Sequence, residues 1–219
     1  DMRGDVIGIG AWGGGDLMYK DLDNSGSVDP GSKTLDDHGD LRVIGNETPR
    51  FAYSFTLEAK WRFIDLRAYF QGIGKRDYFV GSATFFGYGG KPYQVTLFKD
   101  HLDYFRYAGS ELGANLDPYY GRIRTDGNNV QVCDRFLQDA SYLRLKNLTI
   151  GFSLPENAKI SKYVQKARLY FSAENLFTWT KLKIFDPEAL NFSDGDYSGG
   201  AGKTYPQYRT FSVGLELTF

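Results

Sequence analysis

The chain has 219 residues, with 26 basic and 27 acidic side chains and a formal net charge of −1. Because this balance offers no basic field to a phosphate backbone, we expect no nucleic-acid partner. Mean hydropathy is negative and no apolar run approaches the roughly 18 to 20 residues of a transmembrane helix, whereas 17 Phe, 16 Tyr and 26 Gly favour strands and turns.

Residues 1–50 are rich in Gly and Asp, and within them "DLDNSGSVD" resembles a calcium-binding loop. Five residues stand at positions 1, 3, 5, 7 and 9 of that loop: Asp21, Asp23, Ser25, Ser27 through its carbonyl, and Asp29. Gly26 occupies the sharp turn, but Ser32 replaces the bidentate glutamate at position 12. Candidates for the missing carboxylate are Asp36, Asp37 and Asp40. The motif allows calcium binding, but its departures from the full pattern favour a solvated turn.

Five segments alternate apolar and polar residues with a period of two, which indicates β-strands with two different faces. They are residues 51–61, 63–72, 142–155, 167–179 and 209–219. In the third segment the alternation changes phase, which predicts a β-bulge near Lys146 and Asn147. The apolar face of such a strand lies against a core or against lipid, and the polar face lies against water or a lumen.

The connections between these segments alternate in length. Residues 1–50, 74–138 and 181–207 form long stretches. The turn after Trp61 and residues 155–166 are short. Outer-membrane barrels have this alternation because their periplasmic turns are short and their extracellular loops are long. The sequence therefore predicts an all-β membrane β-barrel in the outer membrane of a Gram-negative bacterium, surrounded by lipid, with the long loops extracellular and the C-terminus periplasmic.

Two further features are typical of a barrel wall. Trp61 and Trp179 stand at opposite ends of their strands, where aromatic girdles meet the two membrane interfaces; packing in a core is the alternative. The polar face carries charges of both signs, which suit a wet or plugged lumen better than a dry core. These residues are Glu58, Asp65, Arg67, Arg144, Arg168, Glu174 and Glu216.

Five strands are too few for a closed barrel, because about eight is the smallest usual number and open edges are not tolerated in lipid. The chain is therefore either part of a larger polypeptide, which we expect, or the partner of one. Residues 1–50 would be an extracellular loop region that holds the Asp-rich motif. Residues 51–219 would contribute the strands and loops of the C-terminal part of one barrel domain.

Three stretches carry a family resemblance: "DASYLRLKNLTIGFSLP", "ARLYFSAENLFTWTKLKIFDPE" and "YPQYRTFSVGLELTF". Preceded by "GDLMYKDLDNSGSVD" and "RVIGNETPRFAYSF", they resemble the C-terminal portion of the SusC/RagA family of TonB-dependent outer-membrane transporters of Bacteroidota. The resemblance implies the last five strands of a 22-stranded barrel that imports glycans or peptides beneath a SusD-like surface lipoprotein. It also implies coupling to the TonB complex through an upstream N-terminal region.

The final residues also resemble the C-terminal signal that the barrel-assembly machinery recognises in outer-membrane proteins. Ser212, Gly214, Leu217 and Phe219 match its pattern. A strand edge with free backbone groups can be captured by strand addition, and the apolar alternation would supply the register. An ordinary lipid-facing strand explains the alternation alone.

The sequence contains no catalytic constellation, because neither His38 nor His101 has zinc-ligand spacing and there is no Ser-centred elbow. We therefore expect a protein without enzymatic activity. Loop aromatics could stack on a ligand or contact the lid, with Phe105, Tyr119 and Tyr120 as candidates, or they could pack the loop on itself. The alternative functions are a passive or structural barrel and a secreted carbohydrate-binding β-sandwich.

Overall fold

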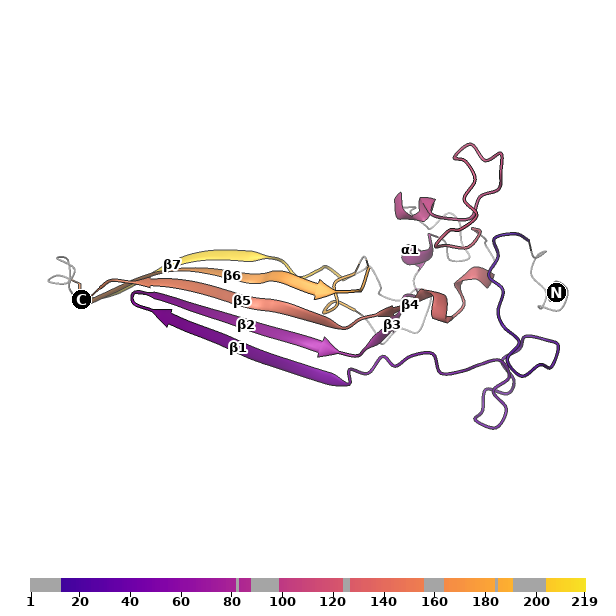
Figure 1. Cartoon of the computed structure of the whole chain (residues 1–219), viewed down its shortest axis with the longest axis horizontal. Helices are drawn as coiled ribbons and strands as arrows, with labels where there is room; N and C mark the ends of the chain where they lie inside the picture. Colours follow the sequence, from indigo (N-terminus) through magenta and orange to yellow (C-terminus); the bar gives the residue numbers. More distant parts are fainter. Residues whose placement is uncertain are drawn as a thin grey trace. The chain divides into compact units, whose positions relative to one another are not determined.

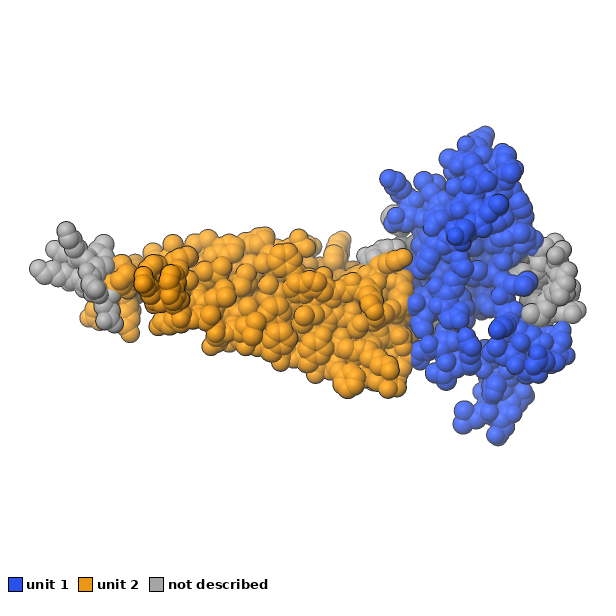
Figure 2. All heavy atoms as spheres, viewed as in Figure 1, with its two compact units in different colours: residues 1–45, 79–137, 191–203 blue, residues 46–78, 138–190, 204–219 orange. Residues whose placement is uncertain are grey.

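The computed structural model describes residues 13–81, 83–87, 99–123, 127–155, 164–183, 185–190 and 204–219. The chain forms two compact units, which Figure 2 shows in blue and orange. Unit 1 comprises residues 1–45, 79–137 and 191–203, and unit 2 comprises residues 46–78, 138–190 and 204–219. Each unit is described below by itself.

Unit 2 contains an antiparallel sheet with the strand order β1-β2-β5-β6-β7, drawn side by side in Figure 1. The strands are β1 (Phe51–Trp61), β2 (Ile64–Gly74), β5 (Tyr142–Ser153), β6 (Lys166–Thr180) and β7 (Thr210–Thr218). Every neighbouring pair is antiparallel. The prediction of an all-β fold with five antiparallel strands is therefore confirmed, with each strand found within a few residues of its expected place.

The register keeps apolar and polar residues on separate faces across all five strands. One row joins Ala59, Leu66, Ile150, Phe171 and Val213 on the apolar face. The neighbouring row, Glu58, Arg67, Thr149, Ser172 and Ser212, lies on the polar face. Because successive side chains in a strand point to opposite faces, the alternation seen in the sequence becomes two surfaces of different chemistry.

The predicted bulge is present in β5. The pairing of β5 with both neighbours shifts between Leu145 and Asn147. On β6 the same irregularity includes Asn175, which has a positive φ of 52°. The bulge returns Leu145 and Leu148 to one face, which explains the phase shift in the sequence.

Unit 1 is built from loops and short helical pieces around an aromatic core. The pieces are α1 (Ala83–Phe86), η2 (Lys99–Leu102), η3 (Asn128–Val130) and η4 (Asp134–Phe136). Its buried side chains include Phe85, Phe86, Tyr120, Val130 and Phe136. Separately, a two-stranded sheet pairs β3 (Asp77–Phe79) with β4 (Leu137–Asp139). Among the described residues, no helix is long and apolar enough to cross a membrane.

Candidate functional site

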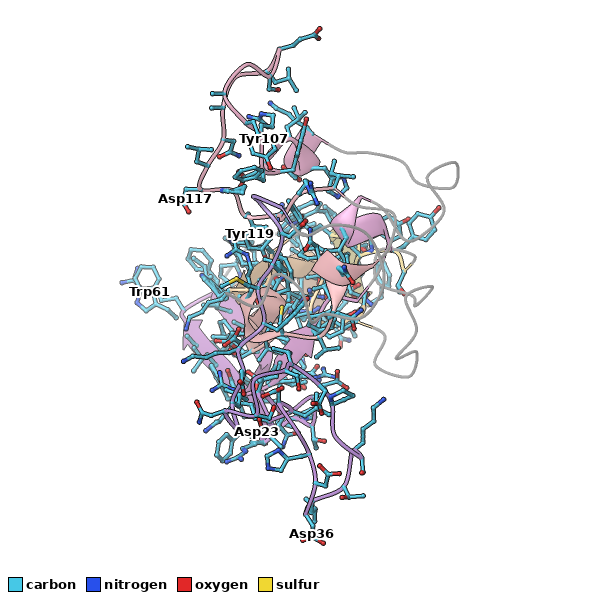
Figure 3. The ribbon with its side chains drawn as sticks, turned by 90° about the vertical axis from the view of Figure 1, so that its right-hand side faces the viewer. Asp23, Asp36, Trp61, Tyr107, Asp117 and Tyr119 are labelled. Atoms are coloured by element: carbon cyan, nitrogen blue, oxygen red, sulfur yellow. The ribbon has the colours of Figure 1, made fainter. Side chains whose placement is uncertain are left out.

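The apolar face of the five-stranded sheet exposes large apolar side chains on every strand. Trp61 on β1 is 65% exposed and Val213 on β7 is 74% exposed, and Figure 3 shows the Trp61 side chain projecting away from the strands. Exposed apolar residues from every strand include Leu57, Leu66, Phe152, Leu169 and Leu215. A contiguous apolar surface of this kind marks contact with another apolar phase or a partner.

Aromatic rings pack against one another on that face. Phe55 of β1 stacks on Phe70 of β2 with ring centroids 4.8 Å apart, and Phe70 lies 6.5 Å from Trp179 of β6. The register places Trp61 and Trp179 on the same face but at opposite ends of the sheet, in the rows of Ile64 and Leu143. This arrangement agrees with the predicted aromatic girdles.

The opposite face carries paired charges near the end of the sheet where β1 turns into β2. Arg168 of β6 reaches across β5 to Asp65 of β2, with nitrogen–oxygen distances of 2.7 and 3.0 Å. It also contacts Glu216 of β7 at 3.4 Å. Gly151 of β5 makes this crossing possible, because a Cβ there would lie 2.5 Å from Asp65 Oδ1. Arg67 and Glu58 form a further pair at 3.2 Å.

A buried ion cluster lies toward the other end of this polar face. Arg144 of β5 is only 2% exposed and pairs with Asp186 at 2.6 Å and Glu188 at 2.7 Å. It also donates a hydrogen bond to Thr178 Oγ1 at 2.8 Å, while Lys146 Nζ lies 2.9 Å from Glu188. The two cations balance the two carboxylates, so the cluster is satisfied although it is largely removed from water.

Asp186 also joins the two ends of the connection between β6 and β7. Its Oδ1 accepts a hydrogen bond from the Glu188 N–H at 2.9 Å, and its Oδ2 accepts one from the Gln207 N–H at 3.0 Å. Burial opposes ionisation of this carboxyl, but these N–H groups and the Arg144 guanidinium outweigh it and lower the pKa of Asp186. The strand pattern predicts Arg144 on the polar face but does not indicate its partners, because residues 185–190 have no periodicity and lie about 40 positions away in the chain.

The Asp-rich loop of unit 1 brings three carboxylates together. Asp21, Asp23 and Asp40 each place one carboxylate oxygen within 4.8 Å of the others. One oxygen of Asp21 accepts the Gly26 N–H at 2.9 Å, but Asp21 Oδ1 is buried without a hydrogen-bond partner. Asp40 accepts the N–H groups of Leu22 and Asp29 at 2.5 and 2.8 Å, which hold it in the cluster.

The other predicted calcium ligands lie beside this cluster and make hydrogen bonds of their own. Ser25 Oγ donates to the Ser27 carbonyl at 3.1 Å. Asp29 accepts the Gly31 N–H at 2.8 Å. The Ser25 N–H and hydroxyl lower the pKa of Asp23. Of the three candidates for the missing carboxylate, Asp40 joins the cluster, whereas Asp37 accepts the Ser32 N–H at 3.0 Å and Asp36 lies at the tip of its loop in Figure 3.

Tyr119 and Tyr120 belong to the aromatic core of unit 1. Tyr120 is 6% exposed, and its ring lies 5.5 Å from both Phe85 and His101. Tyr119 is partly buried, and its ring lies 4.9 Å from that of Tyr120 and 5.7 Å from that of Phe136. Burial raises the pKa of Tyr120 to about 12. These two rings are thus occupied in packing the loop on itself.

The third loop aromatic, Phe105, contacts the start of the described chain. Its ring lies 5.0 Å from that of Tyr107, whose hydroxyl donates to the Gly14 carbonyl at 3.2 Å. Unit 1 also contains a polar cluster centred on Asp16, which pairs with Arg122 at 2.6 Å and accepts a hydrogen bond from Asn129 at 3.1 Å. Asp16 has a side chain only 1% exposed, and no pattern in the sequence indicated this contact over more than 100 positions.

The residues that match an assembly signal lie on both faces of β7. Ser212 pairs with Ser172 and Gly214 with Tyr170 on the polar face. Leu217 pairs with Ala167 on the apolar face, and Phe219 is 78% exposed just after the strand. The four residues therefore do not form one surface patch in the folded sheet.

One continuous sheet with an exposed apolar face and a charge-paired polar face defines the class as a wall segment of a membrane β-barrel. Comparison with known proteins agrees. TonB-dependent receptor P3 of Formosa agariphila is 28% identical over 96% of this chain, and TonB-dependent receptor SusC of Bacteroides thetaiotaomicron is 34% identical over 42% of it. They are covered over 21% and 9% of their own lengths, so the chain spans about a fifth or less of these relatives.

Solved structures give the same result. The RagAB peptide transporter matches over 81% of this chain and 18% of its own, with 28% identity and a TM-score of 0.60. The RagAB peptide importer in its open-open state matches over the same shares with 29% identity and a TM-score of 0.57. No protein-family profile matches the chain. The chain is thus similar over nearly its whole length to TonB-dependent receptors, as the sequence resemblance predicts.

Proposed function

We propose that this chain forms part of the barrel wall of a TonB-dependent outer-membrane importer of nutrients. The observation that carries the proposal is the continuous apolar face of the sheet, exposed on all five strands and opposite a face of paired charges. In water such an exposed apolar face would promote aggregation. In a bilayer the same face contacts the acyl chains of the lipid, which are also apolar. The polar face then borders the aqueous or plugged interior.

The orientation follows from the connections. β1 and β2 are joined by a tight turn at Arg62, which has a positive φ of 53°. At the opposite ends of β2 and β6 the chain enters its long connections. We place the short turns and the C-terminus in the periplasm and the long connections outside the cell.

The partners proposed for the whole protein are those of its relatives. The relatives are TonB-dependent receptors, and RagAB is a peptide importer. We propose a SusD-like surface lipoprotein as the extracellular lid, TonB coupling through an N-terminal region outside this chain, and glycans or peptides as cargo. The homologues are receptors and transporters, which fits a protein without catalytic activity.

The two alternatives predict different behaviour. A passive barrel would lie in the same membrane without a lipoprotein partner or energy-dependent uptake. A secreted sandwich would bury its apolar face beneath a second sheet, but within the described part of unit 2 the apolar face has no such cover. The geometry therefore favours the membrane wall.

Purification of the complete polypeptide from outer membrane in detergent tests the proposal. We expect a heat-modifiable barrel several times larger than 24.7 kDa that co-purifies with a surface lipoprotein and supports TonB-dependent growth on one glycan or peptide. Recovery in a detergent-free soluble fraction would contradict the barrel wall. Recovery in the membrane without a lipoprotein or TonB-dependent growth would instead favour the passive barrel.

We also propose that the Asp-rich loop binds calcium through Asp21, Asp23 and Asp40, with the Ser27 carbonyl as a further oxygen ligand. The buried and unpartnered Asp21 Oδ1 supports this proposal, because a cation would satisfy an oxygen that is otherwise costly to bury. Hard oxygen ligands on a short loop suit Ca²⁺. Ion binding would brace this loop, since three carboxylates at close range repel one another without a cation.

A further inference from the structure

Gly214 is the least exposed residue of the terminal strand β7. Every other residue of Thr210–Thr218 is exposed, whereas Gly214 is partly covered. The cover is the ring of Tyr170, the residue directly opposite on β6. A Cβ added at Gly214 would coincide with the end of this ring, with Cζ, Cε1 and the hydroxyl oxygen as its nearest atoms. Only glycine leaves room for the ring in this position.

Tyr170 lies in a row that we call the glycine row. It consists of Lys60, Asp65, Gly151, Tyr170 and Gly214, which pair in this order across the five strands. Both glycines of the row are positions where a Cβ would collide with a long side chain from a neighbouring strand. The space at Gly151 is thus taken by Asp65 and Arg168, and the space at Gly214 is taken by Tyr170.

The ring of Tyr170 is held from its own strand. The Arg168 guanidinium carbon lies 5.1 Å from the ring centroid, which is a cation–π distance. Arg168 is itself fixed on one side by Asp65 at 2.7 Å and contacts Glu216 on the other at 3.4 Å. This contact favours the ring position that covers Gly214.

The apolar face alone does not define where β7 pairs with β6. Its apolar residues recur at every second position, from Phe211 to Leu217, so a slip of two residues would keep all of them on the same face. Such a slip would bring Ser212 or Glu216 opposite Tyr170 in place of Gly214. Both residues carry a Cβ where the ring lies.

We propose that Tyr170 and Gly214 form a register lock that admits the terminal strand in one alignment only. The inference rests on the proposed function, because β7 is treated as a strand of a barrel wall. It gives Gly214 a role in the folded barrel itself, whereas recognition by the assembly machinery would place that role in the unfolded strand. The two roles predict different genetic interactions between positions 170 and 214.

The test uses Gly214→Val, Tyr170→Ala and the double variant in the complete polypeptide, with heat-modifiable protein in the outer membrane as the readout. Valine has a higher strand propensity than glycine, so a loss cannot come from the strand itself. We expect Gly214→Val to reduce folded protein severalfold and Tyr170→Ala to restore most of it in the double variant. Thr210→Val, on the same face of β7, is the matched control and should assemble normally.

The outcomes separate the two roles. Rescue by Tyr170→Ala supports the lock, because removal of the ring frees the space that valine occupies. A Gly214→Val defect that Tyr170→Ala does not relieve would overturn it, as would normal assembly of Gly214→Val. Absence of the wild-type protein from the outer membrane would contradict the proposed function instead. In that case the lock is tested by refolding the same variants in detergent.

Two cysteine pairs report the register directly, in a background where Cys133 is replaced by serine. Ser172→Cys with Ser212→Cys bridges the native alignment, and Ser172→Cys with Thr210→Cys bridges a slip of two residues. We expect Gly214→Val to lower the yield of the first disulfide severalfold and to raise that of the second. If each disulfide forms in the same yield with and without Gly214→Val, the lock is overturned. This comparison holds even if a variant fails to reach the membrane.

Discussion

Arg144 Nη2 lies 2.6 Å from Asp186 Oδ1 and ties strand β5 to the segment that follows β6. The contact joins residues 42 positions apart and is almost fully removed from water, with side chains 2% and 9% exposed. Asp186 also accepts the Gln207 N–H, so one carboxylate holds both ends of a long connection against the sheet. The cluster thus fixes where this connection leaves the wall.

Loss of the cation from this cluster should be costly. Arg144→Met leaves Asp186 buried without its cation and Glu188 with only Lys146, and removal of one partner from a buried pair typically costs about 3 to 5 kcal/mol. We expect the free energy of unfolding in detergent to fall by that order, with faster proteolysis between residues 181 and 207. Arg67→Met is the matched control, since Arg67 and Glu58 are about two-thirds exposed and such pairs contribute about 1 kcal/mol or less. Equal effects of the two variants would contradict a special role for the buried cluster.

The same cluster predicts a dependence of stability on acid. The pKa of Asp186 lies below its ordinary value of 3.8 in the folded protein. The stabilisation from the ionised carboxylate is therefore complete above pH 3.8 and is lost as the pH falls through the lowered pKa. We expect the stability difference between wild type and Asp186→Asn, measured by unfolding at a series of pH values, to be constant near neutrality and to shrink below about pH 4. A difference that does not change with acid would show that Asp186 is not ionised in the fold.

Gly151 should tolerate no side chain, because its Cβ would meet Asp65 Oδ1 at 2.5 Å and Arg168 Nε at 2.7 Å. Gly151→Ala should therefore displace the Asp65–Arg168 pair and destabilise the barrel by about 1 to 3 kcal/mol, the usual range for overpacking. Gly74→Ala in β2 is the control, since its Cβ would lie 3.6 Å from the nearest atom, in ordinary contact with Phe51. Unfolding in urea measures the stability of both variants. If Gly151→Ala leaves the free energy of unfolding unchanged, the Arg168 side chain can reach Asp65 without the space at position 151.

Calcium binding by the Asp-rich loop can be measured by calorimetry on the purified protein with Ca²⁺ and with Mg²⁺. We expect heat from Ca²⁺ and an affinity at least about tenfold weaker in Asp40→Asn, which removes one of the three clustered carboxylates. Asp36→Asn changes a carboxylate at the loop tip and should bind as wild type does. No calcium heat in the wild type, or equal affinities for the two variants, would leave the loop as a solvated turn.

The strands could be predicted from the sequence because their information is local. Alternation at period two in β1 or β7 is readable within ten residues, and the phase change at Lys146 correctly indicated the bulge. The face on which each residue lies then follows, because one face must stay apolar throughout, whereas the register between neighbouring strands does not. The resemblance of the chain to known transporters lies in these same segments.

The polar clusters around Arg144 and Asp16 could not be predicted, because they join residues that lie far apart in the chain. Asp186 meets Arg144, and Asp16 meets Arg122 and Asn129, through loops without periodicity. The sequence offers three candidates for the missing calcium ligand and does not single out Asp40, whose place depends on hydrogen bonds from the N–H groups of Leu22 and Asp29. Gly214 was noted for its place in a terminal pattern, while the ring that covers it lies 44 positions upstream.

Site-directed spin labelling along β5 tests most directly whether the apolar face lies in lipid. Labels at positions 148, 149 and 150, in a background with Cys133→Ser, are compared for collision with oxygen, which partitions into lipid, and with a water-soluble nickel chelate. Residues Leu148 and Ile150 lie on the apolar face and Thr149 on the polar face. For the complete protein in outer membrane we predict high oxygen and low nickel accessibility at 148 and 150, and the reverse at 149. Accessibility that does not alternate, or nickel access at 148 and 150, would contradict a lipid-facing barrel wall.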